Sequence, residues 1–171
     1  MDKIFIEENG VYGLLYEKAI WATDQMHEEY HKAGLALSDA DFLLENEENI
    51  LIVEYKNANI EGASCASAFK PENDKKFNNS IRKFFDSLHY LRLLAKNKPV
   101  VYVYVLEYPN GDSVTRKRLR ERMKKHLPFA LQENMNTGIK LIEKVDVVSI
   151  EEWNSNKVYG MYPIVKIQNA Q

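Results

Sequence analysis

Two acids and a lysine flank the most apolar stretches of this 171-residue chain. Asp41 precedes the apolar run 42–44, and Glu54 and Lys56 end a second run, Ile50-Leu51-Ile52-Val53-Glu54-Tyr55-Lys56. Side chains alternate between the two faces of a strand, so Glu54 and Lys56 share one face. So apolar a strand is typical of a buried position, where an acid or a lysine must be paired or must bind something. We therefore expect a functional site at the end of this strand.

This arrangement of an acid, a turn and Glu-x-Lys at the end of an apolar strand resembles the PD-(D/E)xK nuclease superfamily. The matching residues are Asp41, Glu54 and Lys56, and Ala40 stands where the superfamily name has proline. The resemblance implies a restriction endonuclease-like core and divalent-metal-dependent hydrolysis of phosphodiester bonds in nucleic acid. It also implies a further acid on the first helix, for which Glu17 is the candidate.

The expected chemistry follows from the residue types. Mg²⁺, or Mn²⁺ in its place, prefers oxygen ligands and keeps several waters, so Asp41, Glu54 and the Tyr55 carbonyl would suffice as ligands. The metal would lower the pKa of a bound water and offset the charge that develops on the phosphate. Lys56 would orient that water and stabilise the transition state. Asp39 is an alternative to Asp41, since the two share a face of a regular strand.

The order of elements agrees with a mixed α/β sheet flanked by helices. Hydrophobic periodicity and turn residues predict a helix over 12–31, strands at 35–37, 41–45 and 50–56, and a helix from 73 to about 96. A strand at 100–106, a helix at 114–126 and a strand at 140–148 follow, with an edge strand in the tail, 155–171. This αβββαβαβ order implies a hairpin that brings Asp41 opposite Glu54 and Lys56, and then parallel pairing across the helical crossover.

Length and composition indicate one domain over 1–171 in an ordinary cytoplasmic protein. The chain shows no stretch typical of a transmembrane helix and no signal-peptide pattern. The single cysteine, Cys65, excludes an internal disulfide and is expected to be a reduced, non-catalytic thiol. The net charge of −2 means that any nucleic-acid-binding surface must be local.

The most basic segment is the predicted helix over 114–126. Its outward cations would contact phosphates, with DNA favoured over RNA as the partner, and a homodimer is left open. The start of the preceding helix is a second basic region. The candidate phosphate-binding residues are Arg116, Lys117, Arg120, Lys124, Lys75 and Lys76.

Two alternatives to a nuclease come from the same sequence. His27-Glu28-Glu29-Tyr30-His31 matches the H-E-x-x-H pattern of zinc proteases, with both histidines on one helix face and Glu28 as the base. The other alternative is an inactive member of the nuclease fold that binds nucleic acid or protein. The complete set of Asp41, Glu54 and Lys56 argues against it, since an unused buried pair of acids is costly.

Overall fold

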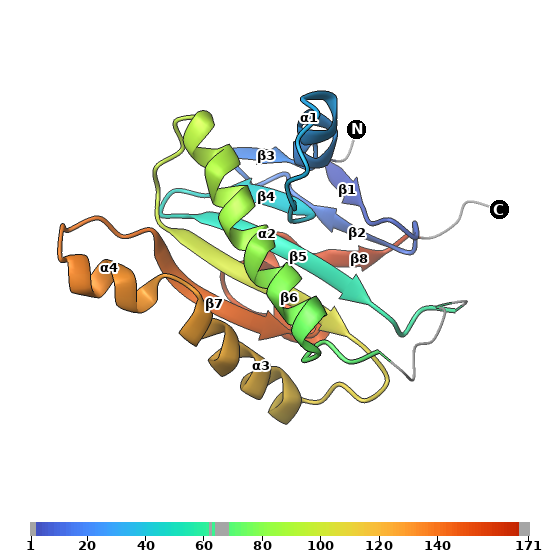
Figure 1. Cartoon of the computed structure of the whole chain (residues 1–171). Coiled ribbons are helices and arrows are strands. Elements are labelled where there is room, and N and C mark those ends of the chain that lie inside the picture. Colours follow the sequence, from blue (N-terminus) through green and yellow to red (C-terminus); the bar gives the residue numbers. More distant parts are fainter. Residues whose placement is uncertain (1–2, 62, 64–68, 168–171) are drawn as a thin grey trace.

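A five-stranded mixed sheet forms the centre of the molecule in the computed structural model, which describes residues 3–61, 63 and 69–167 (Figure 1). The strand order is β3 (Trp21–Thr23), β4 (Phe42–Glu45), β5 (Ile50–Asn57), β6 (Val100–Glu107) and β7 (Ile142–Val148). The β3, β4 and β5 strands are antiparallel neighbours, while β5, β6 and β7 run parallel. The predicted mixed α/β class is therefore confirmed.

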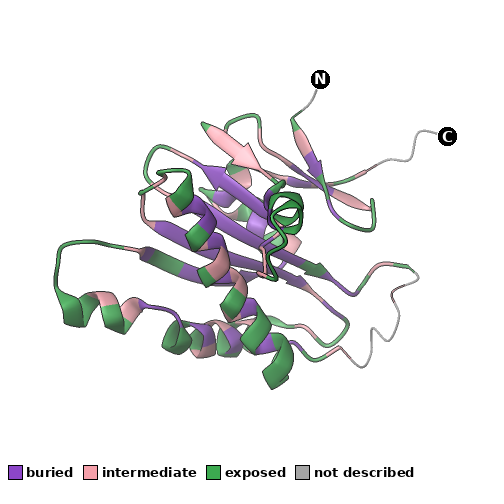
Figure 2. Ribbon diagram, turned by 45° about the horizontal axis from the view of Figure 1, so that its top comes forward, coloured by how far each residue is buried: buried purple, intermediate pink, exposed green. Residues whose placement is uncertain are grey.

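Four helices cover one face of this sheet: α1 (Met26–Lys32), α2 (Asp74–Leu93), α3 (Ser113–His126) and α4 (Phe129–Met135). α2 lies across β5 and β6 and buries Phe77, Phe84 and Leu91 against them. These residues recur at intervals of seven, which places them on one helical stripe. Residues from α1 and α3 complete this core, in which the strands are almost wholly buried (Figure 2).

The other face of the large sheet is covered by a second, smaller sheet and the helix α5 (Ile150–Ser155). The small sheet has the order β1 (Ile4–Ile6), β2 (Tyr12–Leu15) and β8 (Ile164–Lys166), all antiparallel. The 3₁₀ helix η2 (Tyr159–Met161) precedes β8. Trp153 of α5 packs here in the core, together with Phe5 and Leu14. The tail thus does form an edge strand, in the small sheet.

The predicted helix over 12–31 is wrong, because its first two thirds hold the strands β2 and β3 and the loop between them. β2 pairs with β1 across the Asn9-Gly10 turn, in which Gly10 has a φ of +70°, and β3 pairs with β4. Only Met26–Lys32 is helical. The apolar residues matched a helical period by spacing alone, and pairing with distant strands overrode that local preference.

The bounds of several other helices and strands agree closely with the predicted ranges, and some elements were not predicted. β4, β5, α2, β6, α3 and β7 lie within three residues of the predicted ranges. The predicted strand at 35–37 does not form, and the short helices α4 and α5 were not predicted. Cys65 lies outside the described residues. No helix in the described part of the chain has the length and apolar character needed to cross a membrane.

Candidate functional site

The β4–β5 hairpin places Asp41 beside the end of β5, as predicted. Phe42 pairs with Val53, so Asp41 continues the ladder opposite Glu54. The Tyr55 backbone N–H donates a hydrogen bond of 2.7 Å to Asp41 Oδ2. Because opposed residues of antiparallel strands share a face, Asp41 and Glu54 both lie on the side of the sheet that α2 covers.

A lysine from α2 completes this pair of acids. Lys83 Nζ lies 2.7 Å from Glu54 Oε1, and both side chains are largely buried. Lys83 follows Ser80 by three residues and precedes Ser87 by four, so it lies on the face of α2 that packs on the sheet. The cation paired with Glu54 is therefore Lys83, whereas the side chain of Lys56 is exposed.

The segment before Asp41 is fixed to the same helix. Asp86 accepts a hydrogen bond of 2.7 Å from the Ser38 N–H, and Ser87 Oγ accepts one of 3.1 Å from the Ala40 N–H. Arg82 donates to the carbonyl of Ala36. These hydrogen bonds to α2 hold residues 36–40, which precede Asp41 and do not form a strand.

The Glu54 carboxylate is incompletely satisfied. Glu54 is only 7% exposed, and its Oε2 atom has no hydrogen-bond partner among the described residues. Burial raises the pKa of Glu54 to about 8, the nearby charge of Asp41 adds to the rise, and Lys83 opposes it. Burial also raises the pKa of Asp41, against the opposing effects of Lys83 and the Tyr55 N–H. The pair thus holds more negative charge, when ionised, than one lysine balances.

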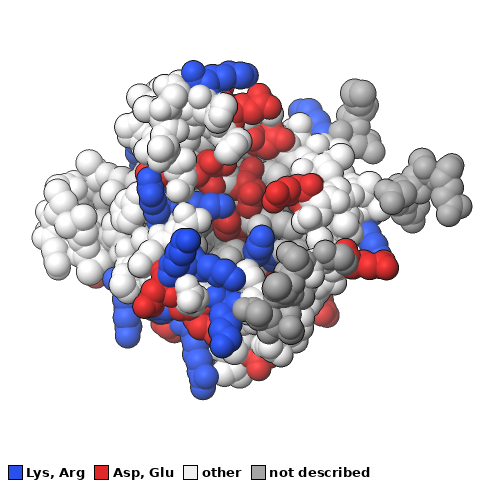
Figure 3. Space-filling model, turned by 45° about the vertical axis from the view of Figure 1, so that its right-hand side comes forward, with Lys and Arg blue, Asp and Glu red and all other residues white. Residues whose placement is uncertain are grey.

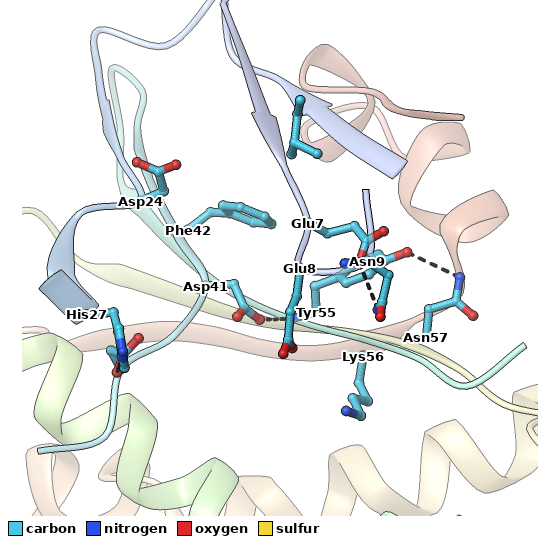
Figure 4. Close-up of a pocket in the computed structure, with 12 residues that line it drawn as sticks. Glu7, Glu8, Asn9, Asp24, His27, Asp41, Phe42, Tyr55, Lys56 and Asn57 are labelled. Atoms are coloured by element: carbon cyan, nitrogen blue, oxygen red, sulfur yellow. Dashed lines mark hydrogen bonds and ion pairs between the residues drawn. The ribbon is translucent and has the colours of Figure 1, made fainter. Parts of the chain in front are cut away.

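A hollow of about 480 Å³ opens beside Asp41 and the end of β5 (Figure 4). Lys56 is exposed and lines it, as do Tyr55 and Asn57. In Figure 4, Asp41 lies between His27 on one side and Lys56 on the other. Lys56 therefore faces the same space as Asp41 and is accessible to a ligand.

Acids from two further segments border this hollow. The buried Glu7 carboxylate accepts hydrogen bonds from the N–H groups of Asn9, Val11 and Tyr12, which fixes the turn that carries Glu8. Glu8 and Asp24 both line the hollow. Asp and Glu gather on this side of the molecule, with Lys and Arg along their border (Figure 3).

A histidine and an aspartate form a hydrogen-bonded pair at the same hollow. His27 Nδ1 and Asp39 Oδ1 are 3.1 Å apart, with side-chain exposures of 73% and 20%. Both residues line the hollow together with Asp41. Asp39 thus lies beside the site, where it is engaged with His27.

Glu17 is not placed with these residues. It is exposed in the loop between β2 and β3 and is not among the residues that line the hollow. Trp21, at the start of β3, pairs with Glu45, at the end of β4 far from Asp41. The loop that carries Glu17 therefore leaves the sheet at the opposite end from the site. The helix expected to present this acid does not form.

The basic residues of α3 are mostly engaged within the molecule. Arg116 forms two hydrogen bonds with Glu152, Arg120 lies 3.5 Å from Asp146, and Lys124 lies over the Phe129 ring. Lys117 is exposed. None of these four residues lines the hollow beside Asp41.

The basic start of α2 lies closer to the site. Lys75 and Lys76 are exposed, and Lys76 lies 4.3 Å from the centre of the Phe69 ring. Lys76 also lines a second hollow. Lys56 and Asn57 line both this hollow and the one beside Asp41. The two hollows therefore adjoin at Lys56, and Lys76 lies along their continuation.

The H-E-x-x-H segment forms α1, as a zinc protease would require. Its two histidine rings are 6.5 Å apart between centroids, but Glu28 pairs with Lys32 and His27 with Asp39. A catalytic zinc site needs three protein ligands. Within the described residues, no three His, Cys, Asp or Glu side chains are placed to hold one metal ion.

Sequence reasoning missed Lys83 as a site residue, along with Glu8 and Asp24. Lys83 had one detectable signal, because a lysine beside Phe84 on an apolar helix stripe needs a buried partner. Glu8 lies in the β1–β2 turn and Asp24 lies between β3 and α1. Neither position could be recognised as long as residues 12–31 were predicted to form one helix.

No protein-family model, curated protein or solved structure matches this chain.

Proposed function

We propose that this protein is a divalent-metal-dependent nuclease with a restriction endonuclease-like core. The observation that carries the proposal is the buried Glu54 Oε2, which has no partner among the described residues and shares its site with Asp41. A buried carboxylate oxygen without a donor is costly, and a cation would offset that cost.

The residues fit Mg²⁺ or Mn²⁺ better than zinc. One or two carboxylates are enough for Mg²⁺, which keeps several of its waters, and Asp41 and Glu54 provide two. The Tyr55 carbonyl is the third ligand that we propose. When bound, the cation would supply a water of lowered pKa and a positive charge beside the phosphate.

The two lysines would have different tasks. Lys83 is paired with Glu54 and holds that carboxylate in one position from the helix side. Lys56 is exposed in the hollow, so its ammonium group can contact a phosphate and stabilise the charge that develops during hydrolysis. In this proposal Lys56, a compact cation that faces solvent, is the lysine that contacts the substrate.

The adjoining hollows supply a path for a nucleic acid. Lys56 and Lys76 border that path, whereas Arg116 and Arg120 of α3 are paired with acids. Exposed cations release counterions when they contact phosphates, which favours binding. DNA remains the favoured substrate, and a homodimer remains a prediction.

A second candidate is a non-catalytic binding protein of the same fold. The Lys83–Glu54 ion pair favours it, since this contact would also serve a purely structural role. The free Oε2 of Glu54 and the exposed Lys56 favour the nuclease.

Calorimetry with Mn²⁺ tests the proposal, followed by a cleavage assay on single-stranded and duplex oligonucleotides. We expect Mn²⁺ to bind to the wild-type protein, and Glu54→Gln and Asp41→Asn to abolish binding and cleavage. Glu45→Gln is the matched control, because Glu45 is a buried acid at the other end of the same hairpin and pairs with Lys96 and Lys98. Mn²⁺ binding that survives in Glu54→Gln would remove Glu54 from the site. Binding without cleavage would favour the non-catalytic candidate.

A further inference from the structure

The hydrogen-bonded pair of His27 and Asp39 is not explained by packing. His27 is mostly exposed, yet its ring is oriented by Asp39, two residues before Asp41 in the chain. Both residues line the hollow that Asp41 and Lys56 also line. A carboxylate that holds one imidazole nitrogen leaves the other, Nε2, free to face a ligand.

The backbone segments that carry His27 and Asp39 are both anchored to the rest of the fold. Met26 and Tyr30 anchor α1 in the core, and the Tyr30 hydroxyl donates a hydrogen bond of 2.5 Å to the Asp86 carbonyl on α2. The segment that carries Asp39 is fixed to the same helix through Ser38 and Ala40. The two backbone segments that carry the pair are therefore both attached to α2, the helix that also bears Lys83.

We infer that His27, oriented by Asp39, is the general acid that protonates the leaving oxygen during phosphodiester cleavage. The inference rests on the proposed nuclease function. Histidine is the side chain most often used for proton transfer near neutral pH. The Asp39 carboxylate on Nδ1 orients the ring and leaves Nε2 free to give its proton to the leaving oxygen.

The proton balance of this step is complete without an added reagent. Water forms the new bond to phosphorus and releases one proton to bulk water. The bond from phosphorus to the leaving oxygen breaks, and that oxygen takes a proton from His27 Nε2. The neutral ring keeps its Nδ1–H bond to Asp39 and regains a proton from bulk water.

Substrates that differ only in the leaving atom test this role. One oligonucleotide has natural linkages, and two of the same sequence carry sulfur at the 3′ or the 5′ bridging position, which covers either direction of cleavage. A thiolate leaves without protonation. We expect His27→Gln to slow cleavage of the natural linkage about 100-fold and cleavage with the sulfur leaving group less than about twofold. Mn²⁺ affinity should not change.

His31→Gln is the matched control, because His31 is exposed one turn later on α1 and does not line the hollow. It should cleave all three substrates like the wild type. An equal loss in His27→Gln on natural and sulfur linkages, or no loss on either, would overturn the inference while the nuclease function stands. A wild-type protein that binds Mn²⁺ but cleaves none of the substrates would overturn both.

Discussion

Lys83 Nζ lies 2.7 Å from Glu54 Oε1, which joins helix α2 to the end of strand β5 through one ion pair. Burial acts to lower the pKa of Lys83, but the charges of Glu54 and Asp41 raise it above its usual range. Lys83 is therefore a permanent cation that partly balances two acids. The remaining negative charge decides how the site responds to pH, to mutation and to metal.

The first prediction concerns the pH dependence of stability without metal. The pKa of Glu54 is about 8 in the folded protein and near 4.5 when exposed, so the folded state holds a proton that the unfolded state releases between these values. Folding is therefore increasingly penalised as pH rises through this window. Glu54→Gln should match the wild type near pH 5 and exceed it near pH 9 by a few kcal/mol, at about 1.4 kcal/mol per pKa unit.

Urea unfolding in EDTA over pH 5–9 measures this difference. Asp41, whose pKa is also raised, remains in both proteins, so only the difference between them reports on Glu54. Parallel stability curves would mean that Glu54 titrates at its ordinary value.

The second prediction concerns proton release on metal binding. A cation that binds Glu54 at pH 7 must displace the proton that its raised pKa retains, so about one proton should be released per Mn²⁺. Calorimetry in buffers of different ionisation enthalpy counts these protons. Above pH 9 the release should vanish. A count of zero at pH 7 would exclude Glu54 as a protonated ligand.

The third prediction concerns the ion pair itself. Lys83→Met should destabilise the protein by about 3 kcal/mol at pH 9, because it leaves Glu54 buried without its cation. The double variant Lys83→Met, Glu54→Gln should recover most of that loss, since the buried charge is gone. Denaturant unfolding of all four proteins completes the cycle. Glu54→Gln should stabilise the Lys83→Met protein more than it stabilises the wild type, and an equal effect in both backgrounds would show that the two side chains do not interact.

The fourth prediction separates Lys56 from the fold. Lys56→Met should change the free energy of unfolding by less than about 0.5 kcal/mol, because the side chain is exposed. It should lower kcat for oligonucleotide cleavage by about 100-fold and leave Mn²⁺ affinity intact. Lys117→Met is the control, an exposed lysine away from the hollow. Full activity in Lys56→Met would assign the chemistry to other residues.

The fifth prediction concerns the nucleic-acid path. In the inactive Glu54→Gln background, Lys56→Ser with Lys76→Ser should flatten the slope of log affinity against log salt by roughly two units. Arg116→Ser with Lys117→Ser should not change it, because Arg116 is held by Glu152. Fluorescence anisotropy over a salt series measures both. The reverse result would place the substrate on α3.

The β4–β5 hairpin and the residues at its open end could be predicted from the sequence. Alternation along Ile50–Lys56 assigned Glu54 and Lys56 to one face, and a four-residue turn brought Asp41 opposite them. These relations are local, since they depend on strand geometry and on a short connection. The helices at 74–93 and 113–126 were equally predictable from their periodic apolar stripes.

The other residues of the site are brought to it by packing between elements that are far apart in sequence. Lys83 reaches Glu54 because α2 packs on β5 with one particular rotation, and the His27–Asp39 pair forms because both segments are fixed to that helix. Tyr12–Leu15 and Trp21–Thr23 became strands because β8 and β4, which come later in the chain, were available to pair with them. Contacts between segments far apart in sequence set these outcomes, and no local pattern of residues encodes them.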